Sequence, residues 1–259
     1  MHKLLTDRPG EKMFLLGNEA IARGAIEAGV AFASTYPGTP SSEISANFFQ
    51  ISRESDLYFE YSTNEKVALE VAAAAANAGV RSMCIMKHVG VNVAADALMT
   101  LAYVGVRAGL VILTADDPYM FSSQNEQDNR YYGKLSGLPI LEPTTGDEAR
   151  EMIAYAFEIS EKLQEPVLLR TTTRLNHSTS PVILGPIRKP VTKGDFGKDP
   201  FNYVTVPAVS RNLHVKLLKN IENAADLSEE SPYNRVDGSG SWGMICNGVG
   251  YNYVNDAVQ

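Results

Sequence analysis

Cysteine is scarce in this sequence, and the two that occur, Cys84 and Cys246, lie far apart. Neither has companions at the spacing of metal or cluster ligands, so these residues encode no disulfide framework and no iron–sulfur site. Unpaired cysteines are typical of a reducing compartment. We therefore expect a cytoplasmic protein.

Positive charge and long apolar runs are lacking as well. The net charge of −7 leaves no broad basic face to neutralise phosphates, which argues against a nucleic-acid partner. The apolar runs are interrupted well short of a membrane span, and the start of the chain has no apolar core like that of a signal peptide, so we expect no membrane partner. Small molecules and other proteins are the partners that remain.

What the sequence does contain is a repeated pattern from Met13 to about Thr173. A short apolar run is followed by a polar cluster and then by a segment of helical periodicity. Apolar runs of this kind suit strands that are buried on both faces. The pattern predicts an α/β fold with a doubly wound, mostly parallel sheet and helices on both faces. The expected strands are residues 13–16, 31–35, 57–61, 82–86, 110–114 and 166–171.

The chain divides into three parts on this basis. Residues 1–180 form the α/β domain. Residues 181–240 are rich in proline and predict a long ordered strap followed by one amphipathic helix. Residues 241–259 predict a strand, a glycine turn and the start of a helix, which indicates the first elements of a further α/β domain.

Polar clusters follow the expected strands at their carboxyl ends, where a parallel sheet binds its ligands. One of them, at residues 36–39, precedes a helix for which Thr39 is a natural N-cap and Pro40 a natural first residue. Capping leaves Tyr36-Pro37-Gly38 unexplained, and a glycine after a rigid proline lets the backbone approach a ligand closely. We interpret this stretch as part of a ligand site.

Glu65 has two interpretations. It completes a capping box that starts at Ser62, in which its side chain bonds the Ser62 backbone N–H. Alternatively, it is a carboxylate at a strand-to-helix turn that binds one hydrogen-bond donor of a heterocycle and takes part in proton transfer. The sequence leaves both open.

Two further clusters follow the later strands. Lys87 and His88 lie beside a glycine turn, with Asn92 one helical turn further on, although a lone histidine is more often structural than catalytic. Residues 116–130 contain several carboxylates in a proline- and serine-rich loop without EF-hand spacing, so we predict no metal site there. A lid or docking loop is the better interpretation.

Five stretches carry a family resemblance that covers nearly the whole chain. They are GNEAIARGAIEAGV, YPGTPSSEI, NEKVALEVAAAAANAG, KHVGVNVAADAL and ADDPYMFSSQNEQDNRYYG. Together they resemble the N-terminal part of the α subunit of indolepyruvate ferredoxin oxidoreductases, within the thiamine-diphosphate-dependent 2-oxoacid:ferredoxin oxidoreductase family. The resemblance implies that residues 1–180 are the pyrimidine-binding domain of the thiamine diphosphate fold.

The resemblance also implies roles for individual residues. Glu65 would hydrogen-bond N1′ of the aminopyrimidine and so promote loss of the thiazolium C2 proton. His88 would be a second catalytic residue, as a proton or carboxylate partner, and Thr39 would lie near the reacting carbon. The implied cofactor-binding residues are Tyr36, Pro37, Gly38, Thr39, Glu65, Lys87, Val89, Gly90 and Asn92.

The reaction implied by the resemblance is oxidative decarboxylation of a 2-oxo acid, specifically an arylpyruvate such as indolepyruvate. Coenzyme A takes the acyl group and ferredoxin takes the electrons. The cofactor supplies that chemistry, and the protein supplies orientation and proton handling.

The chain also departs from the family pattern. The family's α subunit continues into a transketolase C-terminal-like domain, which residues 241–259 would begin, a diphosphate-binding domain that holds magnesium, and a segment with [4Fe–4S] clusters. We therefore expect a half-site for thiamine diphosphate, completed by a diphosphate-binding domain or a β subunit in a homo- or hetero-oligomer. Related pyruvate enzymes bind the substrate carboxylate with an arginine where this chain has Asp116 and Asp117. That difference fits the arylpyruvate branch and leaves the carboxylate-binding residue unassigned.

Two alternatives stay open. The chain could be a split pyrimidine subunit of another 2-oxoacid oxidoreductase or decarboxylase. It could also be a non-catalytic module for dimerisation or regulation, in which Glu65 serves only as a helix cap.

Overall fold

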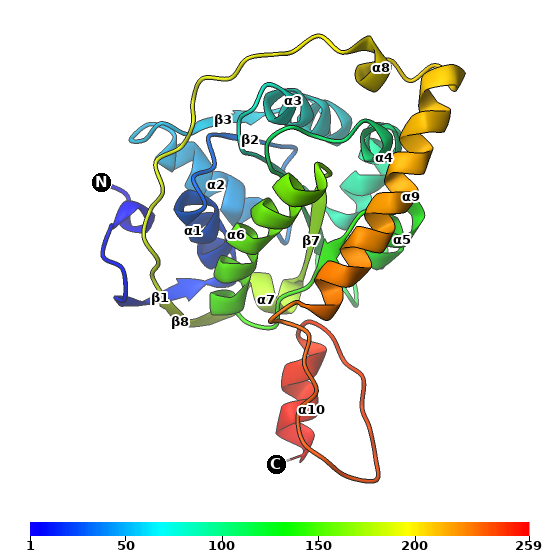
Figure 1. The fold of residues 1–259 in the computed structure, drawn as a ribbon. Coiled ribbons are helices and arrows are strands. Elements are labelled where there is room, and N and C mark those ends of the chain that lie inside the picture. Colours follow the sequence, from blue (N-terminus) through cyan, green and yellow to red (C-terminus); the bar gives the residue numbers. More distant parts are fainter. Residues whose placement is uncertain (259) are drawn as a thin grey trace.

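Six strands form the central sheet of the computed structural model, which describes residues 1–258 (Figure 1). Their order is β3-β2-β4-β5-β7-β6, and every neighbouring pair is parallel. This arrangement confirms the predicted doubly wound α/β class. The strands are β2 (Phe32–Thr35), β3 (Tyr58–Tyr61), β4 (Ser82–Lys87), β5 (Leu110–Asp116), β6 (Ile140–Leu141) and β7 (Val167–Thr172).

Helices cover both faces of this sheet (Figure 1). Alternate side chains of β4 enter two separate cores, Met83 and Ile85 on one face and Cys84 and Met86 on the other. The first core is shared with α1 (Gly17–Glu27), α2 (Ser42–Ile51) and α6 (Gly146–Leu163), and the second with α3 (Glu65–Asn77), α4 (His88–Val104) and α9 (Pro207–Glu229). Burial on both faces explains why these strands read as continuous apolar runs.

The remaining helices are short. They are η1 (Lys3–Leu5), α5 (Arg130–Ser136), α7 (Thr173–Asn176), α8 (Pro200–Tyr203) and α10 (Gly250–Val258). Among residues 1–258, every helix is too short or too polar to cross a membrane.

The first expected strand does not belong to the parallel sheet. β1 (Lys12–Leu16) instead pairs antiparallel with β8 (Thr179–Ile183) in a separate two-stranded sheet. The reason lies in its side chains: Leu15 is buried but Phe14 is 69% exposed, so this strand has one buried face. β8 spans the expected boundary at residue 180.

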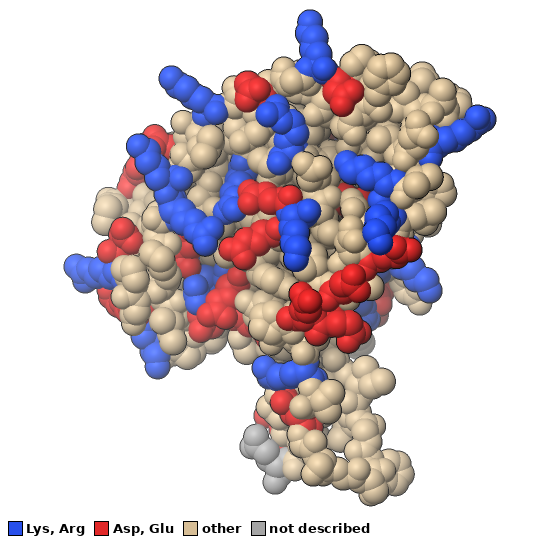
Figure 2. Space-filling model, in the orientation of Figure 1, with Lys and Arg blue, Asp and Glu red and all other residues tan. Residues whose placement is uncertain are grey.

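The expected strand near the end of the chain is also absent from the described residues. Residues 241–249 form neither helix nor strand and lead into α10, which projects away from the body (Figure 1). The side chain of Trp242 is 92% exposed, and Figure 2 shows few charged side chains on this projection. A strand is stable only beside another strand, and this segment runs beside none within residues 1–258.

The segment between β8 and α9 crosses the surface before returning to the body. Residues 184–199 contain no regular secondary structure, and Asp195 is tied to the body by its backbone N–H, which bonds the carbonyl of Ala78. The next long element, α9, buries Leu213 and Leu217 against the body.

Glu165 links α9 to the loop between α6 and β7. Its side chain is buried, and Nδ2 of Asn220 donates a 2.8 Å hydrogen bond to its Oε1. Within the described residues, Oε2 has no hydrogen-bond partner. Burial raises the pKa of Glu165 to about 7, against the opposing effects of the Asn220 hydrogen bond and the Lys216 charge.

This raised pKa predicts a pH dependence of stability. The folded state holds the Glu165 proton up to a pH of about 7, whereas the unfolded chain releases it near 4.3. Between these values the folded state binds more protons, so the free energy of unfolding should fall as pH rises, by a contribution on the order of 3 kcal/mol. Urea unfolding at pH 5 and pH 8 should therefore show a smaller difference for Glu165→Gln than for the unchanged chain. Equal differences in the two proteins would contradict this prediction.

Candidate functional site

The direction of the chain connections reverses between β2 and β4. The chain passes from β2 outward to β3 and then returns across β2 to β4. As a result, α2 and α4 leave neighbouring strands toward opposite faces of the sheet. An open α/β sheet binds ligands at such a switch point, beyond the carboxyl ends of the strands. The switch point is therefore the candidate site, and most of the predicted site residues lie there.

The turn after β2 contacts Lys87, the last residue of β4 and the N-cap of α4. A Cβ atom on Gly38 would lie 2.7 Å from Cδ of Lys87 and 2.9 Å from its Cγ. The glycine therefore makes room for the aliphatic part of the Lys87 side chain. Tyr36 and Pro37 are exposed at this edge, and Thr39 is half-buried.

Helix α2 begins at Ser42 with Ser41 as N-cap, so the expected cap at Thr39 is wrong. The physical reason is a tight turn, in which the Ser41 backbone N–H bonds the Gly38 carbonyl at 3.0 Å. The carbonyl of Pro40 accepts a 2.7 Å hydrogen bond from Asn18 Nδ2. Since Asn18 in turn accepts a 2.6 Å bond from Nδ2 of Asn176, two buried asparagines that the sequence did not single out fix the turn.

Glu65 is the first residue of α3, and the capping-box interpretation is wrong. Asn64 is the N-cap and its side chain accepts a 2.9 Å bond from the Val67 backbone N–H, while the Ser62 backbone N–H bonds the Thr35 carbonyl. The Glu65 side chain is 9% exposed and accepts no hydrogen bond from any residue the structure describes.

The Glu65 carboxylate lies against the first turn of α4. A Cβ atom on Gly90 would come within 2.7 Å of Glu65 Oε1 and within 2.7 Å of its Cγ. The two residues therefore meet because position 90 has no side chain. An acceptor-only group is left free at the junction of α3 and α4, where it can bind a hydrogen-bond donor of a ligand.

His88 and Asn92 form hydrogen bonds with residues after β5 and none with Glu65. His88 is fully buried and its Nε2 donates a 3.0 Å bond to the Asn125 carbonyl, which can only accept. Asn92 exchanges two hydrogen bonds with Gln127, at 2.9 and 3.0 Å, and accepts a 2.6 Å bond from the hydroxyl of Tyr132. Both predicted site residues thus hold the loop that follows β5. Val89, between the two predicted residues Lys87 and Gly90, is half-buried.

The base of this loop, residues 117–129, is fixed by buried charge. Asp116 pairs with Arg170 Nε at 2.7 Å and accepts a 3.0 Å bond from the Asn129 backbone N–H. Burial raises the pKa of Asp116, although the Arg170 charge and the Asn129 hydrogen bond oppose that rise. Arg170 also pairs with Glu142. The sequence analysis did not identify this network. Arg170, a charged residue within the otherwise apolar start of β7, is the feature of the sequence that could have indicated it.

The second aspartate anchors the tip of the same loop. Asp117 accepts hydrogen bonds from Ser122 N, Ser123 Oγ and Thr173 Oγ1. Burial alone would raise the pKa of Asp117, but these hydrogen bonds outweigh it and lower that pKa to about 2. At the tip, the side chains of Tyr119 and Phe121 are exposed. The loop therefore has a rigid base and an apolar tip.

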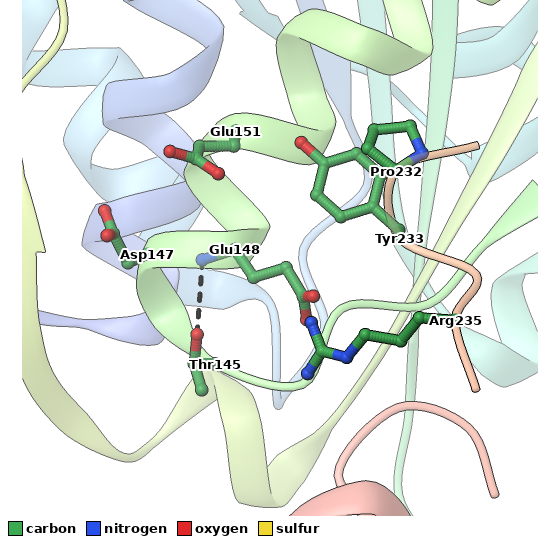
Figure 3. A pocket seen from close by; sticks show the side chains of 7 residues that line it. All are labelled: Thr145, Asp147, Glu148, Glu151, Pro232, Tyr233 and Arg235. Atoms are coloured by element: carbon green, nitrogen blue, oxygen red, sulfur yellow. Dashed lines mark hydrogen bonds between the residues drawn. The ribbon is translucent and has the colours of Figure 1, made fainter. Parts of the chain in front are cut away.

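Two hollows lie away from the switch point. One, with a volume of about 550 Å³, opens between α6 and the chain after α9 (Figure 3). Its acidic side chains already have partners: Asp147 bonds Arg150, and Glu148 accepts from the Thr144 backbone N–H. The other, of about 320 Å³, separates α4 and α5 from α9. Neither hollow includes a predicted site residue. The residues lining the first are Thr145, Asp147, Glu148, Glu151, Pro232, Tyr233 and Arg235.

A doubly wound sheet with a free carboxylate at its switch point defines a ligand-binding α/β domain. Residues 23–204 match the family described as pyruvate flavodoxin/ferredoxin oxidoreductase, thiamine diP-binding. The match covers most of the sequence, and the chain belongs to this family.

Two relatives extend this finding over the whole chain. The chain is 53% identical over 262 residues to indolepyruvate oxidoreductase subunit IorA of Methanothermobacter thermautotrophicus, covering 100% of this chain and 42% of that protein. It is 47% identical over 262 residues to the subunit of the same name from Pyrococcus horikoshii, covering 98% of this chain and 40% of that protein. The chain thus spans about two fifths of the length of these relatives. The predicted resemblance to the N-terminal part of such subunits is confirmed.

A solved structure supports the fold. The 2-oxoglutarate:ferredoxin oxidoreductase from Magnetococcus marinus, solved with 2-oxoglutarate, coenzyme A and succinyl-CoA bound, superposes with a TM-score of 0.66 at 17% identity. The match covers 90% of this chain and 47% of that one. At this low identity, the likeness concerns the fold alone.

Proposed function

We propose that the chain is the pyrimidine-binding part of a thiamine-diphosphate-dependent indolepyruvate:ferredoxin oxidoreductase. The whole enzyme would convert an arylpyruvate to an acyl-CoA and pass the electrons to ferredoxin. The observation that carries this proposal is the free, nearly buried carboxylate of Glu65 at the switch point. The family match and the printed function of the relatives support it.

The residues at the switch point fit the aminopyrimidine of the cofactor. Glu65 offers an oxygen acceptor for a ring N–H, and the missing Cβ of Gly90 lets that carboxylate lie against the first turn of α4 at the switch point. The bound cofactor supplies carbanion chemistry at its thiazolium ring. Glu65 would hold and return the proton at its carboxylate oxygen, and Tyr36, Pro37 and Thr39 would line the exposed side of the pocket.

His88 has a different role in this proposal from the one expected. Its Nε2 is occupied by the Asn125 carbonyl and its ring is buried beneath the loop, so it would position the loop and not touch the substrate. Asn92 would act in the same way through Gln127.

The other half of the enzyme would come from a diphosphate-binding domain or subunit that holds magnesium and from [4Fe–4S] clusters outside this chain. The complex would be an oligomer. Two unpaired cysteines, Cys84 and Cys246, suit a cytoplasmic enzyme.

Calorimetric titration of thiamine diphosphate with magnesium tests this proposal. We expect binding when the polypeptide that supplies the diphosphate site is mixed with the chain, and little heat from the chain alone. The physical reason is that the charged diphosphate contributes more to affinity than one hydrogen bond to the ring. Absence of binding both with the partner polypeptide and with the chain alone would favour the non-catalytic module instead.

A further inference from the structure

Most charged groups at the carboxyl edge of the sheet are already paired. Arg170 is held by Asp116 and Glu142, and Arg130 is held by Asp128 at 2.6 Å. Both arginines are therefore already neutralised by carboxylates of this chain.

The cations beside the switch point are also committed, with one exception. Lys66, next to Glu65 on α3, bonds Asp96 at 2.7 Å. His88 is buried and donates to a backbone carbonyl. Lys87 remains: its ammonium makes no ion pair or hydrogen bond with any of residues 1–258.

Two opposite charges are therefore free at the switch point, Glu65 in the first turn of α3 and Lys87 at the end of β4. Glu65 lies against Gly90, and Lys87 lies against Gly38, so that each of the two glycines of the switch point makes room for one charged side chain. The two charges do not pair with each other, because the structure has no contact within 4.0 Å between them. A ligand that suits this arrangement has a hydrogen-bond donor for Glu65 and an anionic group for Lys87.

The surroundings of Lys87 favour binding of a small anion. Its side chain is half-buried, and the methylenes packed on Gly38 restrict its motion, which lowers the entropy lost on binding. A charge-assisted hydrogen bond to a carboxylate is stronger in such a site than on an open surface.

We propose that Lys87 binds the carboxylate of the 2-oxo acid substrate. This inference rests on the proposed function, since it takes the anion to be the substrate of the same enzyme. Asp116 and Asp117, at the end of β5, are both held by partners of their own. Lys87 supplies an unpaired positive charge at the end of β4, which is the neighbour of β5 in the sheet.

The test compares a carboxylate with its uncharged amide. In the assembled enzyme, with thiamine diphosphate and magnesium present, calorimetry measures binding of indole-3-propionate and indole-3-propionamide. We expect the unchanged enzyme to prefer the carboxylate by about 10- to 100-fold and Lys87→Met to lose that preference. Lys87→Arg should keep most of it, because the charge is conserved. Lys66→Met is the matched control, since it removes a neighbouring lysine that is paired elsewhere, and it should leave the preference unchanged.

Two results would overturn the inference. One is an unchanged carboxylate preference in Lys87→Met with thiamine diphosphate bound as tightly as before. The other is a retained preference together with weaker binding of thiamine diphosphate, which would assign Lys87 to the cofactor. The proposed function fails separately, when Glu65→Gln leaves turnover intact. Loss of carboxylate preference in Lys87→Met would still support an anion site in that case.

Discussion

Replacing Glu65 with glutamine in the assembled enzyme is expected to lower turnover of the 2-oxo acid by about 100- to 10,000-fold. Glutamine has nearly the same shape, but its amide cannot take up and return a proton at the position of the carboxylate oxygen. Because Glu65 accepts no hydrogen bond from residues 1–258, the substitution should leave the fold intact. The measurement is steady-state reduction of ferredoxin with indolepyruvate and coenzyme A, at saturating thiamine diphosphate.

The control for this experiment lies on the same helix. Glu70 is exposed on α3, one turn beyond Glu65, and Glu70→Gln removes the same charge without touching the switch point. We expect it to retain turnover within a factor of about two. If Glu65→Gln were as active as Glu70→Gln, Glu65 would have no role in proton transfer and the non-catalytic module would be favoured.

The sequence was sufficient for the parallel sheet because local patterns determine it. Five expected apolar runs became β2, β3, β4, β5 and β7. The central strands β4, β5 and β7 are buried along almost their whole length, whereas the edge strand β3 is partly exposed. The first run also forms a strand, β1, but its expected place in the parallel sheet is wrong. Phe14 faces outward, and no local pattern shows that the partner strand lies near residue 180. The two-residue strand β6 is too short to have a pattern of its own.

The candidate site was predictable as a region but not as a set of contacts. Gly38 was expected to let a ligand approach, and the structure shows that it makes room for the Lys87 side chain, as Gly90 does for Glu65. Those contacts join segments that are tens of residues apart, so no spacing rule reveals them. The hydrogen-bond partner of His88 could not be predicted either. It is the backbone carbonyl of Asn125, and every residue has such a carbonyl, so the sequence does not mark it.

Replacing Arg170 with methionine is expected to destabilise the chain by about 3–5 kcal/mol. Arg170 Nε lies 2.7 Å from Asp116 Oδ2, and its side chain is 6% exposed. Methionine fills similar space but leaves Asp116 and Glu142 in the interior without their cation. A buried carboxylate that loses its partner costs far more than the pair itself contributes. Urea unfolding measures the change.

A surface pair of the same length isolates the effect of burial. Lys219 Nζ also lies 2.7 Å from a carboxylate oxygen, that of Glu222, but their side chains are 67% and 69% exposed. Lys219→Met should therefore leave the urea unfolding midpoint nearly unchanged. Adding Asp116→Asn to Arg170→Met should recover part of the loss, because one of the two stranded carboxylates is then uncharged. Equal unfolding midpoints for Arg170→Met and Lys219→Met would show that the buried network does not hold the loop base in place.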